Sequence, residues 1–167
     1  MREWWRSLFA PRAEPAPREI DEVRTLRDGL EHLDDESLKR AARSATRVPE
    51  IVAVTAVVAS RVLGLHMFDP QLEGALAMAH GRIVEMQTGE GKTLAAVPAV
   101  AWYARSGGGV HVLTANDYLA RRDAEWMGET YRWLGLSVAA VTQEMTAEER
   151  RAAYRSDVTY ASANELG

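Results

Sequence analysis

Residue types that bind phosphate are concentrated in one glycine-rich stretch, residues 87–93, which reads Gln-Thr-Gly-Glu-Gly-Lys-Thr. Gly89 and Gly91 allow a tight backbone turn that brings N–H groups close to an anion. Lys92 adds a positive charge for the outer phosphates of a nucleotide, and the Thr93 hydroxyl is a ligand for Mg²⁺. The stretch is therefore predicted to be a phosphate-binding loop. Its predicted nucleotide-binding residues are Gly89, Glu90, Gly91, Lys92 and Thr93.

Such a loop has to be held between a strand and a helix. The apolar run 83–86 is predicted to be the strand, and a helix from Lys92 to Arg105 would point its free N–H groups and its positive dipole end at the phosphate. The common loop pattern opens with Gly, whereas this chain has Met86, five residues before Gly91. A plain glycine turn with an exposed lysine is the alternative interpretation, and the flanking strand and helix favour the phosphate loop.

Strand and helix signals alternate through the second half of the chain. Further apolar strands are predicted at 110–114, 137–141 and 158–161, separated by helices at 118–134 and 146–155. Crossovers of more than about a dozen residues join parallel strands and place helices on the faces of the sheet. The sequence thus predicts an α/β fold with a parallel sheet of four strands, in which ligands bind at the carboxyl ends of the strands.

Three regions are expected along the chain: a flexible basic-aromatic tail at 1–18, a helical N-terminal segment at 19–66, and the first part of a nucleotide-binding domain at 67–167. Within the second region, a helix from Glu50 to Leu63 is apolar almost all round, which predicts that it is buried. Gly64 should end this helix. The residues expected to cap helix N-termini are Asp34, Asp69, Asn116, Asp117, Thr146 and Glu149.

The tail has two interpretations. Trp4 and Trp5 lie near basic residues, a combination that suits the headgroup region of a membrane. The alternative is a frayed terminus that packs its tryptophans on the domain, and the short length of the segment favours this second interpretation.

The amino-acid composition argues against several classes of protein. The 167 residues carry a net charge of −4, which argues against a protein that coats nucleic acid. The absence of Cys excludes disulfides and thiolate metal sites, and the four histidines do not occur at ligand spacing. Apolar runs are too short for a spanning helix or a signal peptide. We therefore expect a cytoplasmic protein whose metal, if any, is Mg²⁺ held jointly by Thr93 and a nucleotide phosphate.

Hydrolysis of a nucleotide needs more than a phosphate loop. It needs an acidic residue at a strand end for Mg²⁺ and a group that positions the attacking water. The nearest acidic pair, Asp21-Glu22, lies on an amphipathic helix upstream of the loop, and Glu148 and Glu149 are better explained as helix caps. The chain is expected to bind nucleotide but to lack a complete hydrolytic apparatus.

Four motifs in order resemble the SecA preprotein-translocase ATPases. They are Phe68-Asp69-x-Gln71-Leu72, Glu85-Met86-x-Thr88-Gly89-Glu90-Gly91-Lys92-Thr93, the run from Val110 to Asp123, and Asp157-Val158-Thr159-Tyr160. Met86 is typical of that family. The resemblance covers roughly residues 20–167 and implies part of a RecA-like motor domain, the chain being the amino-terminal fragment of a longer protein. The ending at 160–165 resembles the accessory, second SecA type.

The resemblance implies several roles. Gln71 would read adenine, since a side-chain amide offers one donor and one acceptor; a glutamine that caps its own helix is the alternative. ATP and Mg²⁺ are the implied cofactors, with Thr93 as the metal ligand. The implied partners are preproteins and the SecYEG channel, at the inner face of the cell membrane. An anionic membrane surface and a homodimer of the full-length protein remain open, and no nucleic acid is expected.

Two other functions stay open at this point. A fragment of a nucleic-acid helicase would share the glutamine and the phosphate loop, although a basic stripe is missing from the predicted helices. A truncated, non-enzymatic module that binds a membrane or a partner is the third possibility. Either way, the fragment alone is not expected to hydrolyse ATP.

Overall fold

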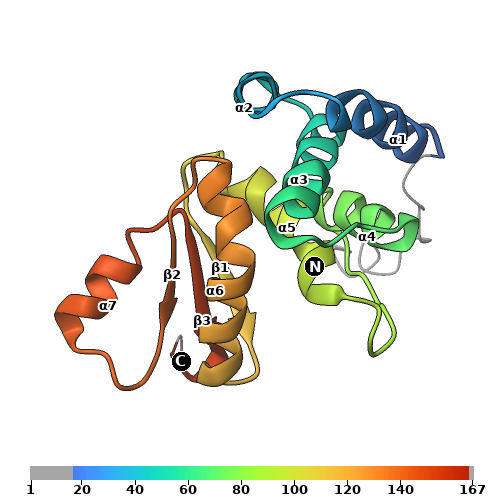
Figure 1. The fold of residues 1–167 in the computed structure, drawn as a ribbon. Coiled ribbons are helices and arrows are strands. Elements are labelled where there is room, and N and C mark those ends of the chain that lie inside the picture. The colour runs from blue at the N-terminus through green and yellow to red at the C-terminus, as the bar shows by residue number, and fades with distance from the viewer. Residues whose placement is uncertain (1–16, 166–167) are drawn as a thin grey trace, which may run out of the picture.

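The computed structural model describes residues 17–165, and Figure 1 shows their course. The elements, in order, are α1 (Pro17–Glu31), α2 (Asp35–Ser44), α3 (Val48–Leu63), α4 (Asp69–Ala79), α5 (Lys92–Ala104), β1 (Val110–Thr114), α6 (Asp117–Trp133), β2 (Val138–Val141), α7 (Ala147–Ala153), β3 (Val158–Ser162) and the short 3-10 helix η2 (Ala163–Glu165). Helices make up the first half of this order, and strands alternate with helices in the second.

The sheet has three parallel strands in the order β1-β3-β2. The central strand β3 is buried along its whole length and pairs in register, with Val158 opposite both Val110 and Val138. Successive side chains of a strand point to opposite faces. Accordingly, Val158 and Tyr160 join the core that contains α6, and Ala161 packs with Ala153 of α7. The predicted α/β class with helices flanking a parallel sheet is confirmed (Figure 1).

One predicted strand is wrong. Residues 83–86 have no regular secondary structure, and the Ile83 side chain is fully exposed, at 102% of its reference area. A strand is defined by hydrogen bonds to a neighbour, and in the described part of the chain no strand lies beside this run. Apolar character alone therefore did not make a strand here. The other three predicted strands are present.

The N-terminal boundary also differs from the prediction. The first helix begins at Pro17, inside the predicted tail, because proline is well accommodated in the first turn of a helix. The interpretation of Trp4 and Trp5 concerns residues that lie outside the described range.

The predicted cap at Asp69 is wrong, since Phe68 occupies the N-cap position and Asp69 is already the first residue of α4. The Asp69 carboxylate instead accepts a hydrogen bond from Arg24 of α1, at 2.7 Å. The Phe68 N–H donates a hydrogen bond to Gln71 Oε1, with 2.9 Å between the nitrogen and the oxygen. An ion pair between helices has replaced the expected local cap.

Helix α3 is buried nearly all round, as predicted, and ends at Gly64 in the left-handed conformation with φ of 67°. It packs against α1, α2, α4, α5 and α6. One continuous core runs from Ile20 of α1 to Tyr160 of β3. The helical first half and the sheet therefore share their interior around α3, which Figure 1 shows beside α5.

Candidate functional site

The glycine-rich loop connects α4 to α5, and its last glycine is the N-cap of α5. Gly89 and Gly91 have φ values of 92° and 76°, a left-handed region that glycine enters without strain. No side chain caps the start of α5. A helix N-terminus leaves its first N–H groups without partners inside the helix, so the loop presents backbone donors suited to an anion.

Gln71 lies directly against this loop. Its Nε2 donates a hydrogen bond to the Glu90 carbonyl oxygen at 2.9 Å, while its Oε1 accepts from the Phe68 N–H. A Cβ atom added to Gly91 would stand only 2.3 Å from Gln71 Nε2, so a larger residue there would force the Gln71 amide to move, and the positive φ of Gly91 independently favours glycine. Both halves of the amide are engaged within the protein, and the adenine-reading role of Gln71 stays a prediction.

The charged side chains of the loop bind the loop itself. Lys92 Nζ donates to the Gln87 carbonyl oxygen at 2.6 Å. The Gln87 N–H in turn donates to Glu90 Oε2, also at 2.6 Å. The sequence had placed Glu90 and Lys92 in the loop, but their mutual attachment to Gln87 was not foreseen, because loop conformation is not encoded by residue type alone.

Thr93, the predicted Mg²⁺ ligand, lies in the first turn of α5, one residue after Lys92. Between residues 17 and 165, no group of three or more His, Asp or Glu side chains is arranged to hold a metal ion. A hard cation at Thr93 would need most of its oxygen ligands from another source. The predicted loop residues thus come together as one unit with Gln71, and their roles in binding remain predictions.

A polar hollow of about 330 Å³ lies at the carboxyl ends of the strands. It is lined by Ala115, Asn116, Asp117, Tyr118, Gln143, Ser162 and Asn164. None of the residues 87–93 lines it, so the glycine loop and this hollow are distinct features. Sequence reasoning missed the hollow because its lining comes from three separate connections.

Asp117 organises this edge of the sheet. It was expected to cap α6 together with Asn116, but the Asn116 Oδ1 alone caps, accepting from the Leu119 N–H at 2.9 Å. The Asp117 carboxylate instead accepts from the Ser162 hydroxyl at 2.6 Å and from the Gln143 N–H at 2.8 Å. These two hydrogen bonds, with that of Ser162 the larger cause, lower the pKa of Asp117.

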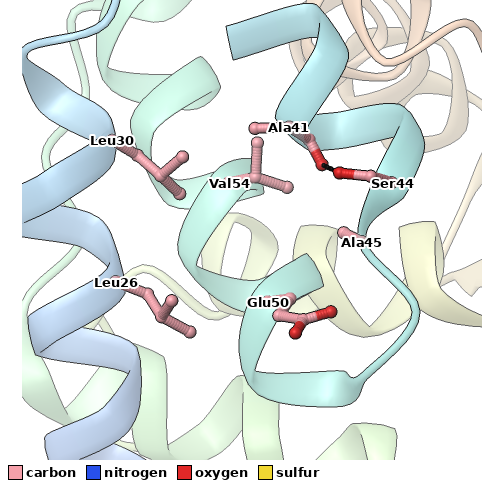
Figure 2. Close-up of a pocket in the computed structure, with 7 residues that line it drawn as sticks. All are labelled: Leu26, Leu30, Ala41, Ser44, Ala45, Glu50 and Val54. Carbon is pink, nitrogen blue, oxygen red and sulfur yellow. Dashed lines mark hydrogen bonds between the residues drawn. The ribbon is translucent and has the colours of Figure 1, made fainter. Parts of the chain in front are cut away.

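A second hollow, of about 220 Å³, lies among α1, α2 and α3 and is lined mainly by apolar side chains, with Glu50 at its side (Figure 2). The Glu50 carboxylate accepts three hydrogen bonds, from the Thr46 and Arg47 N–H groups and from Arg47 Nε. The Thr46 N–H is the main cause that lowers the pKa of Glu50. This hollow belongs to the helical half and includes no residue of the loop.

A parallel sheet flanked by helices makes the chain part of a RecA-like α/β domain, in which a Gly-Lys-Thr sequence stands at the start of α5 without the strand that was expected before it. The family model of the SecA DEAD-like domain matches residues 13–167, and the chain belongs to the SecA family. The resemblance inferred from the four motifs is thereby confirmed.

Curated relatives agree with this assignment. The chain is 54% identical over 143 residues to protein translocase subunit SecA 3 of Mycolicibacterium vanbaalenii, covering 81% of this chain and 18% of that protein. It is 47% identical to protein translocase subunit SecA 2 of Mycobacterium sp. strain KMS, covering 99% of this chain and 23% of the relative. Identity to protein translocase subunit SecA of Mycobacterium avium strain 104 is 52%, covering 81% and 18%. The chain thus spans about a fifth of the length of these relatives.

Across the described residues, no helix combines the length and the apolar character needed to cross a lipid bilayer.

Proposed function

We propose that this chain is the ATP-binding part of a SecA-type motor, which in its full length couples ATP hydrolysis to movement of preproteins through the SecYEG channel. The observation that carries the proposal is the loop itself: a lysine and free backbone donors at the start of α5, with Gln71 docked on the loop. Membership of the SecA family supports the identity of the motor. The relatives named above are all translocase subunits, which favours this function over a nucleic-acid helicase.

In this proposal the backbone N–H groups at the start of α5 bind the phosphates, and Lys92 leaves the Gln87 carbonyl to reach the outer phosphates. These donors fit an anion because, among residues 17–165, the helix has no side-chain N-cap. Thr93 would hold Mg²⁺ through its hydroxyl, with phosphate oxygens of the nucleotide as further ligands; such an ion would supply charge neutralisation for phosphoryl transfer.

The 167 residues are not expected to hydrolyse ATP by themselves. Among the described residues, no group of three or more His, Asp or Glu side chains could hold a metal ion, so the carboxylates that hydrolysis needs around Mg²⁺ are not assembled there. We assign hydrolysis to the longer protein, in which a second RecA-like domain would close over the nucleotide.

Location and partners follow from the same proposal. The longer protein would lie at the inner face of the cell membrane, where preproteins and the SecYEG channel are its proposed partners; contact with anionic lipid and a homodimer both stay open. Assignment to the accessory SecA type rests on the residues at 160–165, and relatives of the SecA 2, SecA 3 and SecA kinds are all similar to this chain.

Addition of MgATP is expected to slow amide hydrogen exchange in residues 87–93, because bound phosphate oxygens accept hydrogen bonds from these N–H groups. Exchange detected by mass spectrometry checks this, with the start of α7 as an internal reference, where Thr146 and Glu149 already form a capping box. Equal exchange of the loop with and without MgATP would contradict ATP binding at this site.

Replacing Gln71 with alanine is expected to weaken ATP binding about fivefold, since a lost hydrogen bond to a ligand is worth on the order of 1 kcal/mol. The loss for GTP should be smaller, because guanine offers a different edge to an adenine reader. Calorimetric titration with both nucleotides measures the two losses. Gln143→Ala, at an exposed glutamine after β2, is the matched control. Equal losses for ATP and GTP would assign Gln71 to holding the loop and not to reading adenine.

A further inference from the structure

The glycine-rich loop carries a negatively charged side chain, Glu90, that binds the backbone of the loop itself. The Glu90 carboxylate accepts the Gln87 N–H at 2.6 Å, while Lys92 Nζ donates to the carbonyl oxygen of the same residue. The Glu90 N–H also donates to this oxygen, at 3.3 Å. A negative and a positive side chain thus close the loop on the two backbone groups of Gln87.

One of these contacts engages Lys92, which the proposed function assigns to the outer phosphates, and the other engages the Gln87 N–H of the same loop. A carboxylate and a phosphate oxygen both accept hydrogen bonds from backbone N–H groups, and such charge-assisted bonds are stronger than neutral ones. An arriving phosphate has to displace Glu90 from Gln87 or bind beside it. Binding beside it places two negative charges within a few ångströms, where their repulsion is weakened but not removed by water.

We propose that Glu90 is a positioning residue that holds the resting loop closed and sets its affinity for nucleotide according to the charge of the ligand. The inference rests on the proposed function, because it concerns the same phosphate site. Free ATP carries more negative charge than MgATP, so Glu90 disfavours free ATP more strongly. The loop thereby selects the nucleotide that arrives with its metal.

The test is the Glu90→Gln variant, which keeps a side-chain oxygen able to accept the Gln87 N–H but removes the charge. Affinity for MgATP should rise about threefold, and affinity for ATP in the presence of EDTA about tenfold, the size expected for one charge at a partly screened distance. Calorimetric titration measures both. The gain should shrink as salt is raised from about 0.05 M to about 0.5 M, because salt screens charges.

Two further variants define the controls. Glu129→Gln, at an exposed glutamate of α6, makes the same change in net charge away from the loop and should leave both affinities unchanged. Glu90→Asp keeps the charge on a side chain one methylene shorter and should give no gain. A purely structural role of Glu90 predicts losses in both Glu90 variants and no dependence on ligand charge.

The outcomes are distinct. Equal affinities of the parent and Glu90→Gln for both ligand forms, or an equal gain in Glu129→Gln, would overturn the inference while leaving nucleotide binding in place. Failure of the parent and Glu90→Gln alike to bind either form would overturn the proposed function, and the inference with it.

Discussion

Replacing Lys92 with alanine is expected to weaken ATP binding by about tenfold to a hundredfold, because hydrogen bonds to charged groups contribute about 1.5–3 kcal/mol. The fold should be unaffected. Lys92 is exposed, and its side chain donates a hydrogen bond to the Gln87 carbonyl of its own loop. Substitutions at such positions usually change the free energy of unfolding by less than about 0.5 kcal/mol. Calorimetric titration with MgATP, together with urea denaturation, measures both effects.

The chain contains one other lysine, Lys39 of α2, which provides a matched control. The Lys39 side chain keeps 41% of its area exposed and pairs with Glu36 of the same helix at 3.0 Å. Lys39→Ala removes the same charge and should leave ATP affinity unchanged. If Lys92→Ala binds ATP as tightly as the parent does, the assignment of the phosphate loop is wrong.

Replacing Leu72 with alanine is expected to lower the free energy of unfolding by about 2–5 kcal/mol, the usual cost of removing a buried leucine side chain and leaving a cavity. Leu72 is completely buried in the main core, on the helix that also carries Gln71. Urea denaturation followed by circular dichroism gives the free energy of unfolding.

Leu113→Ala is the control for this effect, since Leu113 of β1 keeps 54% of its side chain exposed. The same chemical change there removes little buried area and should cost less than about 1 kcal/mol. Similar losses in the two variants would show that burial of Leu72 does not stabilise the fold as the structure indicates.

Two helix caps and one helix end that the sequence predicted are confirmed, because the contacts that fix them lie within a few residues of each other. Asp34 accepts the Ser37 N–H at the start of α2, and Thr146 forms its capping box with Glu149. Gly64 ends α3 in the left-handed conformation that favours glycine. In each case the residue type and its position at the helix end are enough to predict the local conformation.

Features that depend on distant partners were not predictable in this way. Residues 83–86 have the apolar character of a strand but no strand beside them in the described part of the chain. Asp69 and Asp117 are residue types that cap helices, yet their carboxylates bind Arg24 and Ser162, each 45 residues away in the sequence. Tertiary contacts overrode a local preference whose free energy is only about 1 kcal/mol.

The candidate site likewise has features that the sequence predicted and features that depend on tertiary contacts. The composition of residues 87–93 predicts a phosphate loop, and the structure shows that these residues form one loop before α5, while their binding of phosphate stays a prediction. The sequence left two roles open for Gln71, and its amide does cap the start of its own helix. Its second contact, with the Glu90 carbonyl, depends on how α4 and the loop approach each other.

The shared core around α3 has a consequence for how this sequence can vary over evolution. Val54, Val57 and Val58 of α3 pack with Leu38 of α2, and Trp133 at the end of α6 packs against the same cluster. Interiors are close-packed, so a larger side chain on α2 needs compensation on α3 or α6. Residues of α2, α3 and α6 in this cluster are therefore expected to coevolve. Exchanging the helical first half or the sheet alone between homologues would require repacking around α3.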